Sequence, residues 1–230
     1  MRAVSAEHLT QATSYGRHLE PVDALSQFTA LIAGAPGGLA CHGIGLLPAN
    51  ASSPLYHPEG TNIALDGCTA LPTDRVLSFM HLRKVAVTES RPAPHWLSLI
   101  VAALRLGVVA RMLDISYAHL NARSSFGQKT TRHQLIKASF ASIYGEITQL
   151  LGQLSVRLEQ ADYEDLEQEH LAITHLSGQA EKLMGGHGYL LGNTHTLSHF
   201  SMMVYCVFGK TGAPPPSAGN KVNEAWQSLR

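Results

Sequence analysis

The chain has 230 residues, a formal net charge of zero at pH 7 and 45% hydrophobic residues, which is enough to bury a sizeable core. The balanced charge excludes an electrostatic binder of nucleic acid, because such proteins need a basic face against the phosphates. Cys41, Cys68 and Cys206 are few and widely spaced. They indicate reduced thiols in the cytoplasm and exclude a disulfide framework.

The N-terminal part divides into two segments of different texture. Residues 1–23 form a segment with little pattern, in which a short helix is expected over Ala6–Thr13. Residues 24–88 contain short apolar runs separated by Gly, Pro, Asn and Ser, which is typical of strands and turns. Prolines and glycines between positions 34 and 54 would interrupt a helix there. The expected strands are Phe28–Ala33, Ala40–Leu47 and Thr61–Leu71.

A helical region, residues 92–212, follows a linker at Glu89–Pro94. Its first helix is predicted to end near Arg123, and its apolar residues recur at steps of three and four, as one stripe. Arg105 and Arg111 interrupt this apolar segment, so we do not expect it to span a membrane. The stripe consists of Leu97, Ile100, Val101, Leu104, Val108, Met112 and Ile115.

Three further helices are expected. The second carries an apolar stripe from Ile136 to Leu154, and the third runs from Asp162 as N-cap to Gly185 as the stop signal. The fourth covers Thr196–Phe208, and residues 213–230 form a Pro-rich tail with a turn of helix near its end. The predicted fold class is therefore α+β, a small partial β-domain followed by an up-and-down four-helix bundle.

Two motifs lie between the predicted helices. The first is Arg123-x-x-Phe126-Gly127, with Gln134 eight residues after the phenylalanine. The second is Gly-Gly-His-Gly-Tyr at residues 185–189. Glycine accepts the positive φ that ends a helix, so both motifs predict sharp breaks in the backbone.

With these spacings the chain resembles the acyl-CoA dehydrogenase and acyl-CoA oxidase family, and Gly-Gly-His-Gly-Tyr leans toward the oxidase branch. The resemblance covers residues 25–212 or so, the end of the family's middle β-domain plus its C-terminal helical bundle, and leaves no room for the N-terminal domain. It implies FAD as cofactor and an acyl thioester, on coenzyme A or a carrier protein, as substrate.

The resemblance also implies where a flavin would be contacted. Arg123 and Gln134 correspond to residues that reach across a dimer interface to the diphosphate and adenosine of a neighbour's FAD. An arginine fork suits a diphosphate because it donates paired, charge-assisted hydrogen bonds. From the residues alone, Arg123 could instead cap its helix and Phe126 could pack in the core. Where the family commonly has Gln, this chain has Lys182. The implied cofactor-binding set is Arg123, Phe126, Gln134, Gly185, Gly186 and Thr211.

The catalytic carboxylate of the family is missing. Its Glu, eighteen residues after the glycine motif, corresponds to Gly209, which has no proton-accepting side chain. The family's other place for the base falls near Leu97 and Ser98, and neither is a base. No catalytic residue is therefore assigned, and His187 or His195 would have to compensate. His195 and His199 have the spacing of a metal clamp but no third ligand, so no metal site is predicted.

Together these features suggest a flavoprotein subunit that lacks its own catalytic Glu and acts in a heteromeric or homo-oligomeric complex. A homologous partner, or a second copy, would share the FAD and supply the base. Two alternatives stay open: a catalytically inactive homologue that acts by association, and a flavin-dependent oxygenase on the same scaffold. We expect apolar surface left uncovered by the missing domain to form the interface. Neither nucleic acid nor membrane is an expected partner.

Overall fold

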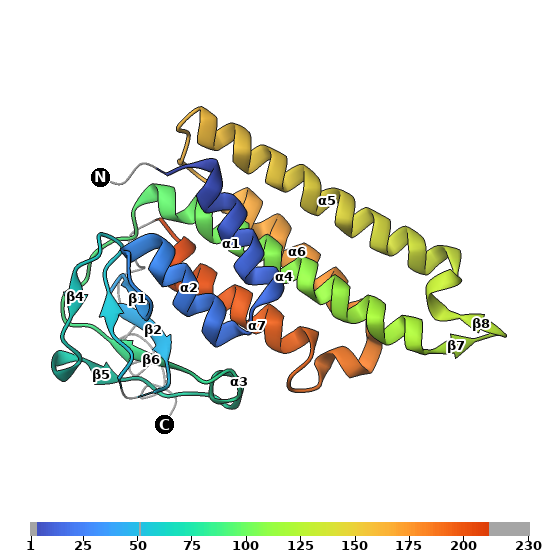
Figure 1. Cartoon of the computed structure of the whole chain (residues 1–230), viewed down its shortest axis with the longest axis horizontal. Helices are drawn as coiled ribbons and strands as arrows, with labels where there is room; N and C mark the ends of the chain where they lie inside the picture. Colours follow the sequence, from blue (N-terminus) through green and yellow to red (C-terminus); the bar gives the residue numbers. More distant parts are fainter. Residues whose placement is uncertain (1–3, 51, 212–230) are drawn as a thin grey trace, which may run out of the picture.

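The computed structural model describes residues 4–50 and 52–211, so the predictions for the tail at residues 213–230 lie outside the described residues. Two helices open the fold, a small sheet follows, and four helices form an up-and-down bundle (Figure 1). The predicted α+β class with a partial sheet and a helical bundle is confirmed. The six long helices among the described residues are α1 (Ala6–His18), α2 (Pro21–Ala33), α4 (His95–Ala122), α5 (Gln134–Glu159), α6 (Glu167–Leu183) and α7 (Thr194–Val204).

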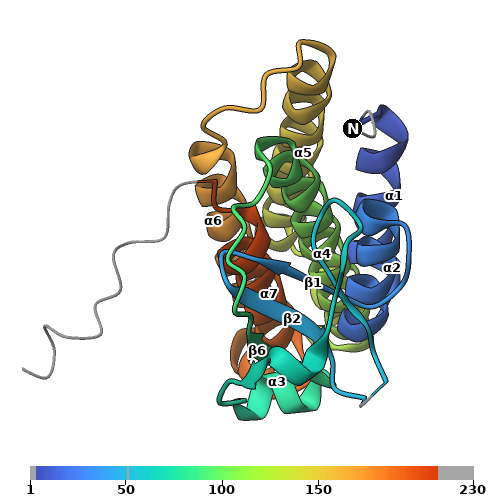
Figure 2. The same cartoon turned by 90° about the vertical axis from the view of Figure 1, so that its left-hand side faces the viewer.

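The sheet lies at one end of the bundle, beside α2 and α7 (Figures 1 and 2). Its strand order is β4-β3-β1-β2-β6-β5, with β1 and β3 parallel and the other neighbours antiparallel. A short helix, α3 (Arg75–Phe79), precedes β6. The strands are β1 (Gly38–Cys41), β2 (Ile44–Pro48), β3 (Leu55–Tyr56), β4 (Asn62–Ile63), β5 (Thr69–Ala70) and β6 (Leu82–Ala86).

The strand predicted at Phe28–Ala33 is wrong, because this segment ends helix α2. Pro21 occupies the first helical turn, where its missing N–H costs nothing. Gly34 ends the helix with φ of 90°. The prolines and glycines that would break a helix all follow residue 33, so they do not disturb α2. The helix expected at Ala6–Thr13 is confirmed and extends to His18.

The predicted N-cap of the third bundle helix is also wrong. Helix α6 begins at Glu167, and Leu166 is its N-cap residue. The Asp162 carboxylate instead accepts a hydrogen bond from the Arg157 guanidinium at 3.0 Å. Asp162 therefore stabilises the loop between α5 and α6 rather than the start of α6.

Helix α4 is the centre of the molecule. Its predicted stripe is buried, apart from the half-buried Ile115, but burial is not confined to that stripe. Residues 97–110 are buried on every face of the helix. Gly16 and Gly107 bring α1 and α4 together so closely that a methyl group on either would meet the other backbone. Arg17 bonds Asp114 at 2.9 Å along the same contact. Helix α1 therefore covers one face of α4.

The composition of α4 reflects this central position. By length and hydropathy alone the helix could cross a membrane, but 89% of its most apolar window is buried inside the protein. A helix that is hydrophobic all round is typical of the centre of a folded core.

Candidate functional site

The first motif forms a hairpin that projects from the end of α4. Helix α4 ends at Ala122, with Arg123 as C-cap, and the strands β7 (Ser124–Ser125) and β8 (Gln128–Lys129) follow. Phe126 and Gly127 connect them with φ of 50° and 78°, the positive values of a type I′ turn. The Phe126 side chain is 98% exposed. The alternative that it packs in the core is therefore wrong.

Hydrogen bonds place Gln134 at the same end as Arg123. The N–H of Thr130 donates to the carbonyl of Arg123 at 3.0 Å, and Ser125 bonds the His133 imidazole at 2.9 Å. The short helix η2 (Thr130–Arg132) then leads into α5, whose first residue is Gln134, with an exposed side chain. The predicted break and restart of the helix are confirmed.

The second motif lies beside the first. Gly185, with φ of 56°, ends α6, and the turn η3 (Gly185–Tyr189) follows. The ring of His187 lies 5.1 Å from that of His119, whose Nε2 accepts from the Arg123 guanidinium at 3.4 Å. Desolvation, His187 and Arg123 all lower the pKa of His119. Its ring is therefore a neutral acceptor at pH 7.

We call this exposed set the Arg123 end. Its members combine a guanidinium, an imidazole and a carboxamide, with no carboxylate among them. A methyl group added at Gly127, Gly185 or Gly186 would meet no other atom within 4 Å, so the backbone here is open to approach. Such donors suit a phosphate-type anion. The residues are Arg123, Phe126, Gln134, Gly185 and Gly186, with His119 and His187.

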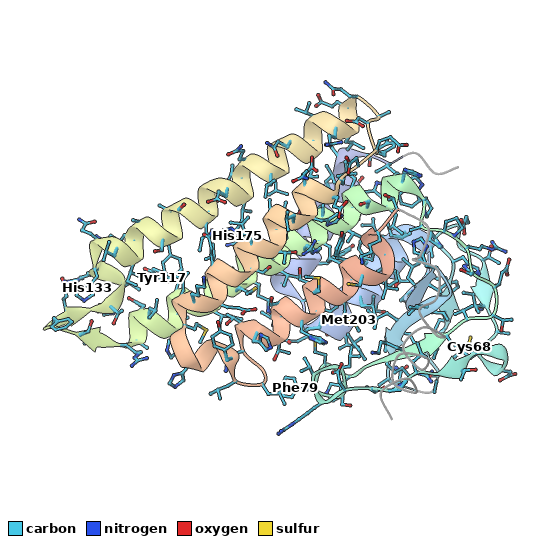
Figure 3. The ribbon with its side chains drawn as sticks, turned by 180° about the vertical axis from the view of Figure 1, so that it is seen from behind. Cys68, Phe79, Tyr117, His133, His175 and Met203 are labelled. Atoms are coloured by element: carbon cyan, nitrogen blue, oxygen red, sulfur yellow. The ribbon has the colours of Figure 1, made fainter. Side chains whose placement is uncertain are left out.

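Gly209 and Thr211 lie at the opposite end of α4. The π-helical turn η4 (Tyr205–Gly209) follows α7, and the carbonyl of Gly209 accepts from the Ser98 hydroxyl at 2.7 Å. Ser98 and Arg123 are 25 residues apart on one helix, which is about 37 Å at 1.5 Å per residue. Figure 3 shows the two ends, with His133 at the hairpin and Cys68 beside the sheet. The structure therefore does not bring Thr211 together with the Arg123 end.

Gly209, where the family resemblance leads us to expect a catalytic base, is surrounded by neighbouring side chains. Gly209 is buried, and a Cβ added to it would lie 2.8 Å from the Tyr205 ring, 3.1 Å from Val101 and 3.3 Å from the ring of His170. Beside it, Phe208 stacks on Phe28 of α2 with ring centres 6.4 Å apart. The packing therefore requires glycine at position 209 and leaves no space for a carboxylate.

A buried polar network beside Gly209 was not predicted. Arg105, only 1% exposed, donates to His170 Nδ1 at 2.9 Å and to Thr174 at 2.7 Å. His170 Nε2 lies 2.9 Å from the Ser98 hydroxyl. The Ser98 hydroxyl donates its only hydrogen to the carbonyl of Gly209, so it can only accept from His170. His170 therefore donates from Nε2 to Ser98 and accepts at Nδ1 from Arg105. One chain of donors thus runs from Arg105 to the carbonyl of Gly209.

Burial and charge keep this network in one protonation state. Desolvation and then Arg105 lower the pKa of His170 to about 3. Desolvation lowers the pKa of Arg105 to about 10, so Arg105 stays charged at pH 7. In the sequence, this network is indicated only by Arg105, an arginine within a long apolar run. A buried charge of this kind needs hydrogen-bond partners inside the protein.

The histidines considered as compensating bases have other partners. His195 lies 3.6 Å from Glu181 and His199 lies 3.7 Å from Asp74, so the two rings do not share a site. The ring of His187 lies 5.1 Å from that of His119, tilted by 42°, at the opposite end of α4 from Gly209. Within residues 4–50 and 52–211, no group of three or more His, Cys, Asp or Glu side chains could hold a metal ion.

Comparison with known proteins identifies the fold. No protein-family profile and no curated protein matches the sequence. The ChsE4–ChsE5 complex from Mycobacterium tuberculosis is similar in structure, with a TM-score of 0.56 and 12% identity over 97% of this chain and 80% of that chain. An acyl-CoA dehydrogenase from Slackia heliotrinireducens gives a TM-score of 0.54 and 13% identity over 97% of this chain and 82% of that one.

A variant of the Tcur3481–Tcur3483 steroid ACAD gives a TM-score of 0.50 and 18% identity over 86% of this chain. This chain spans 64% of the length of that protein. Identities this low carry information on the fold alone. Over most of its length, the chain has the fold of the acyl-CoA dehydrogenases.

Proposed function

We propose that this chain is a non-catalytic subunit of a flavoprotein complex of the acyl-CoA dehydrogenase type. Its role is to complete a flavin site whose pocket and catalytic base belong to a homologous chain. The substrate of the complex is an acyl thioester, on coenzyme A or a carrier protein. One of the similar structures is itself named as a complex, ChsE4–ChsE5.

The observation that carries this proposal is the contrast between the two ends of α4. The base position at Gly209 is buried and filled by Tyr205, Val101 and His170. The Arg123 end is exposed, and it keeps the arginine, aromatic, glutamine and glycines at the family's spacing. A phenylalanine that is 98% exposed at a hairpin tip also favours a partner that covers it.

The side chains of the Arg123 end fit the diphosphate of FAD. Arg123 would donate to the phosphate oxygens, neutral His119 would orient the guanidinium, and Gln134 would hydrogen-bond the adenosine side. Phe126, Gly185 and Gly186 would line the approach. Lys182 adds a second positive charge where the family commonly has Gln. When bound, the flavin would supply the hydride acceptor.

Replacement of Arg123 tests this role. We expect Arg123→Ala, in the complex that binds flavin, to weaken FAD by about 1.5–3 kcal/mol, the range for a hydrogen bond to a charged group. Flavin absorbance in a titration of the assembled complex measures the change. Arg132→Ala is the matched control, because Arg132 is also exposed and lies in the neighbouring turn. Equal FAD affinity in the two variants would leave Arg123 as a helix cap only.

A second candidate function is association without any flavin. The filled position at Gly209 and the Lys182 replacement favour it. In that case the complex would form normally while Arg123→Ala and Arg132→Ala both leave the flavin content unchanged.

A further inference from the structure

Helix α5 lies along the outside of the bundle (Figure 1), with Ile143, Ile147 and Leu154 buried against the core. Over residues 138–156, about 27 Å of helix at 1.5 Å per residue, the only charged side chain is that of Glu146. Glu146 lies to one side, at the groove between α5 and α6. The outward face is therefore exposed and uncharged, whereas surface helices usually carry charged side chains there. Depletion of charge is typical of the centre of a protein interface.

Small residues recur along this outward face. Ala138, Gly145 and Gly152 are exposed and seven residues apart, which places them on one side of the helix. A Cβ added to Gly145 or Gly152 would meet no other atom within 4 Å, so packing among the described residues explains neither glycine. Glycine inside a helix is less stable than alanine, but it allows a second backbone to approach closely.

The two ends of α5 carry opposite charges. No acidic residue occurs between Asp114 and Glu146, whereas residues 159–167 at the far end contain no lysine or arginine. The helix thus joins a basic end to an acidic end through an uncharged exposed face. The basic residues of the first segment are Arg123, Lys129, Arg132 and Lys137, and the acidic residues of the second are Glu159, Asp162, Glu164, Asp165 and Glu167.

This distribution of charge is complementary to itself when one copy is reversed. If α5 of a second copy ran parallel, like charges would face each other. In an antiparallel pair, the basic end of each copy faces the acidic end of the other, which is favourable. A twofold axis beside Gly145 also places Ala138 opposite Gly152 of the second copy, since twofold contacts are reciprocal. The same axis places Leu135, 83% exposed, opposite Val156 of the second copy, which is 50% exposed.

We propose that the outward face of α5 binds the same face of a second copy of this chain, antiparallel and about a twofold axis beside Gly145. The contact covers Leu135 and Val156 at the two ends of the pair and brings the two backbones together at the glycines. It is independent of the flavin role, because no residue from 138 to 156 belongs to the Arg123 end.

Engineered cysteines test the pairing and its direction in a Cys206→Ser background, which removes the exposed native thiol. Gly145→Cys should form a disulfide between two chains on mild oxidation, because a residue beside the axis meets its own copy within the Cα separation of about 7 Å that a disulfide allows. Val156→Cys should not link to itself, since antiparallel pairing separates its two copies by about 33 Å along the helices. A mixture of Val156→Cys with Leu135→Cys should link.

Light scattering on the full chain measures the strength of the contact. The unmodified chain should give twice 24.8 kDa, and Gly145→Leu should raise the Kd of the dimer at least about fivefold, the effect of overpacking a close contact. Gly145→Ala is the matched control: its methyl group is as small as that of Ala138, so the dimer should persist. Position 145 is exposed and open, so neither change puts folding at risk.

A charge exchange completes the test at the two ends. Lys129→Glu and Glu159→Lys, both at exposed positions, should each raise the Kd severalfold, and the double variant should restore it. A 24.8 kDa monomer at tens of micromolar, a Val156→Cys chain that links to itself, or a Gly145→Cys chain that links only to an added homologous protein would each overturn the proposal.

Discussion

At the scale of single residues, Gly209 is closely packed at the position where the family resemblance leads us to expect a catalytic base. The neighbouring rings of Tyr205 and His170 occupy the space that a longer side chain would need. Insertion of Glu at this position would therefore disrupt the packing before it could supply a base.

The first prediction follows from this packing. Gly209→Ala places a methyl group 2.8 Å from the Tyr205 ring, so we expect a loss of about 1–3 kcal/mol in the free energy of unfolding, the range for overpacked cores. Urea denaturation measures it. Gly145→Ala is the control, because Gly145 lies in α5 with no atom within 4 Å of an added Cβ. It should gain about 0.5–1 kcal/mol. A gain at both positions would show that Gly209 is not confined.

The second prediction concerns His170 and pH. Its pKa is lowered from 6.5 to about 3 by burial and then by Arg105. Below pH 6.5 the unfolded chain therefore takes up a proton that the folded chain does not. Stability should fall as pH drops from about 6.5 toward 3, by about 1.4 kcal/mol per pH unit from this residue.

Urea denaturation at pH 7.5, 6 and 5 separates this effect from the other histidines. Between pH 6 and pH 5 the unmodified chain should lose about 1 kcal/mol more than His170→Asn, which lacks the titrating group. Equal losses in the two proteins would mean that His170 is not held neutral in the fold.

At the scale of elements, the β7–β8 hairpin combines an unfavourable turn residue with exposure. Phe126 adopts φ of 50°. This left-handed conformation is free of steric strain only for glycine, and it is sometimes adopted by Asn or Asp. Its ring meets only the edge of His133, at 6.3 Å between centres, and is 98% exposed. Neither backbone nor packing within the chain explains a phenylalanine here, which agrees with its proposed role at an interface.

The third prediction tests that interpretation. Phe126→Asn relieves the turn, because Asn–Gly is the preferred type I′ pair. It should raise the free energy of unfolding by at most about 1–2 kcal/mol, the strain of the left-handed conformation. The same change should weaken association with the flavin-binding partner, measured by sedimentation of the mixture. Phe126→Ala is the control: it removes the ring without relieving the turn, so it should lose association without the gain. Association that survives both changes would remove Phe126 from the interface.

At the scale of the whole molecule, the exposed apolar side chains lie on several elements, among them Tyr117 of α4, Leu171 of α6 and Leu190 after η3. Leu135 is 83% exposed, Tyr144 59% and Val156 50%, all on α5. Helix α5 lies along the outside of the bundle (Figure 1). Leu135 follows closely on the β7–β8 hairpin, so the surface that we expect a partner to cover is the N-terminal end of α5 together with that hairpin.

The fourth prediction is that this surface drives assembly. Light scattering at micromolar concentration should give a mass of at least twice 24.8 kDa, for the chain alone or with a homologous partner. Leu135→Asp should shift the mass toward the monomer, because a charge in an apolar contact must be desolvated. A single 24.8 kDa species in both samples would contradict an obligate assembly.

Much of the fold could be predicted because the signals are local. The break at Phe126–Gly127, the restart at Gln134 and the stop at Gly185 each depend on the φ of a few adjacent residues. The error at Phe28–Ala33 has a local cause as well, since short apolar runs fit strand and helix equally.

The sequence by itself thus determined the bundle, the helix breaks at Phe126–Gly127 and Gly185, and the spacing of Arg123, Phe126 and Gln134, because these follow from backbone conformation and from neighbours within a few turns. Only the tertiary structure shows that the space around Gly209 is occupied by neighbouring side chains. The contact of Ser98 with Gly209 joins residues 111 positions apart, and that of Arg105 with His170 joins residues 65 apart. Only the packing of α2, α4, α6 and η4 around one another brings such groups within hydrogen-bond distance.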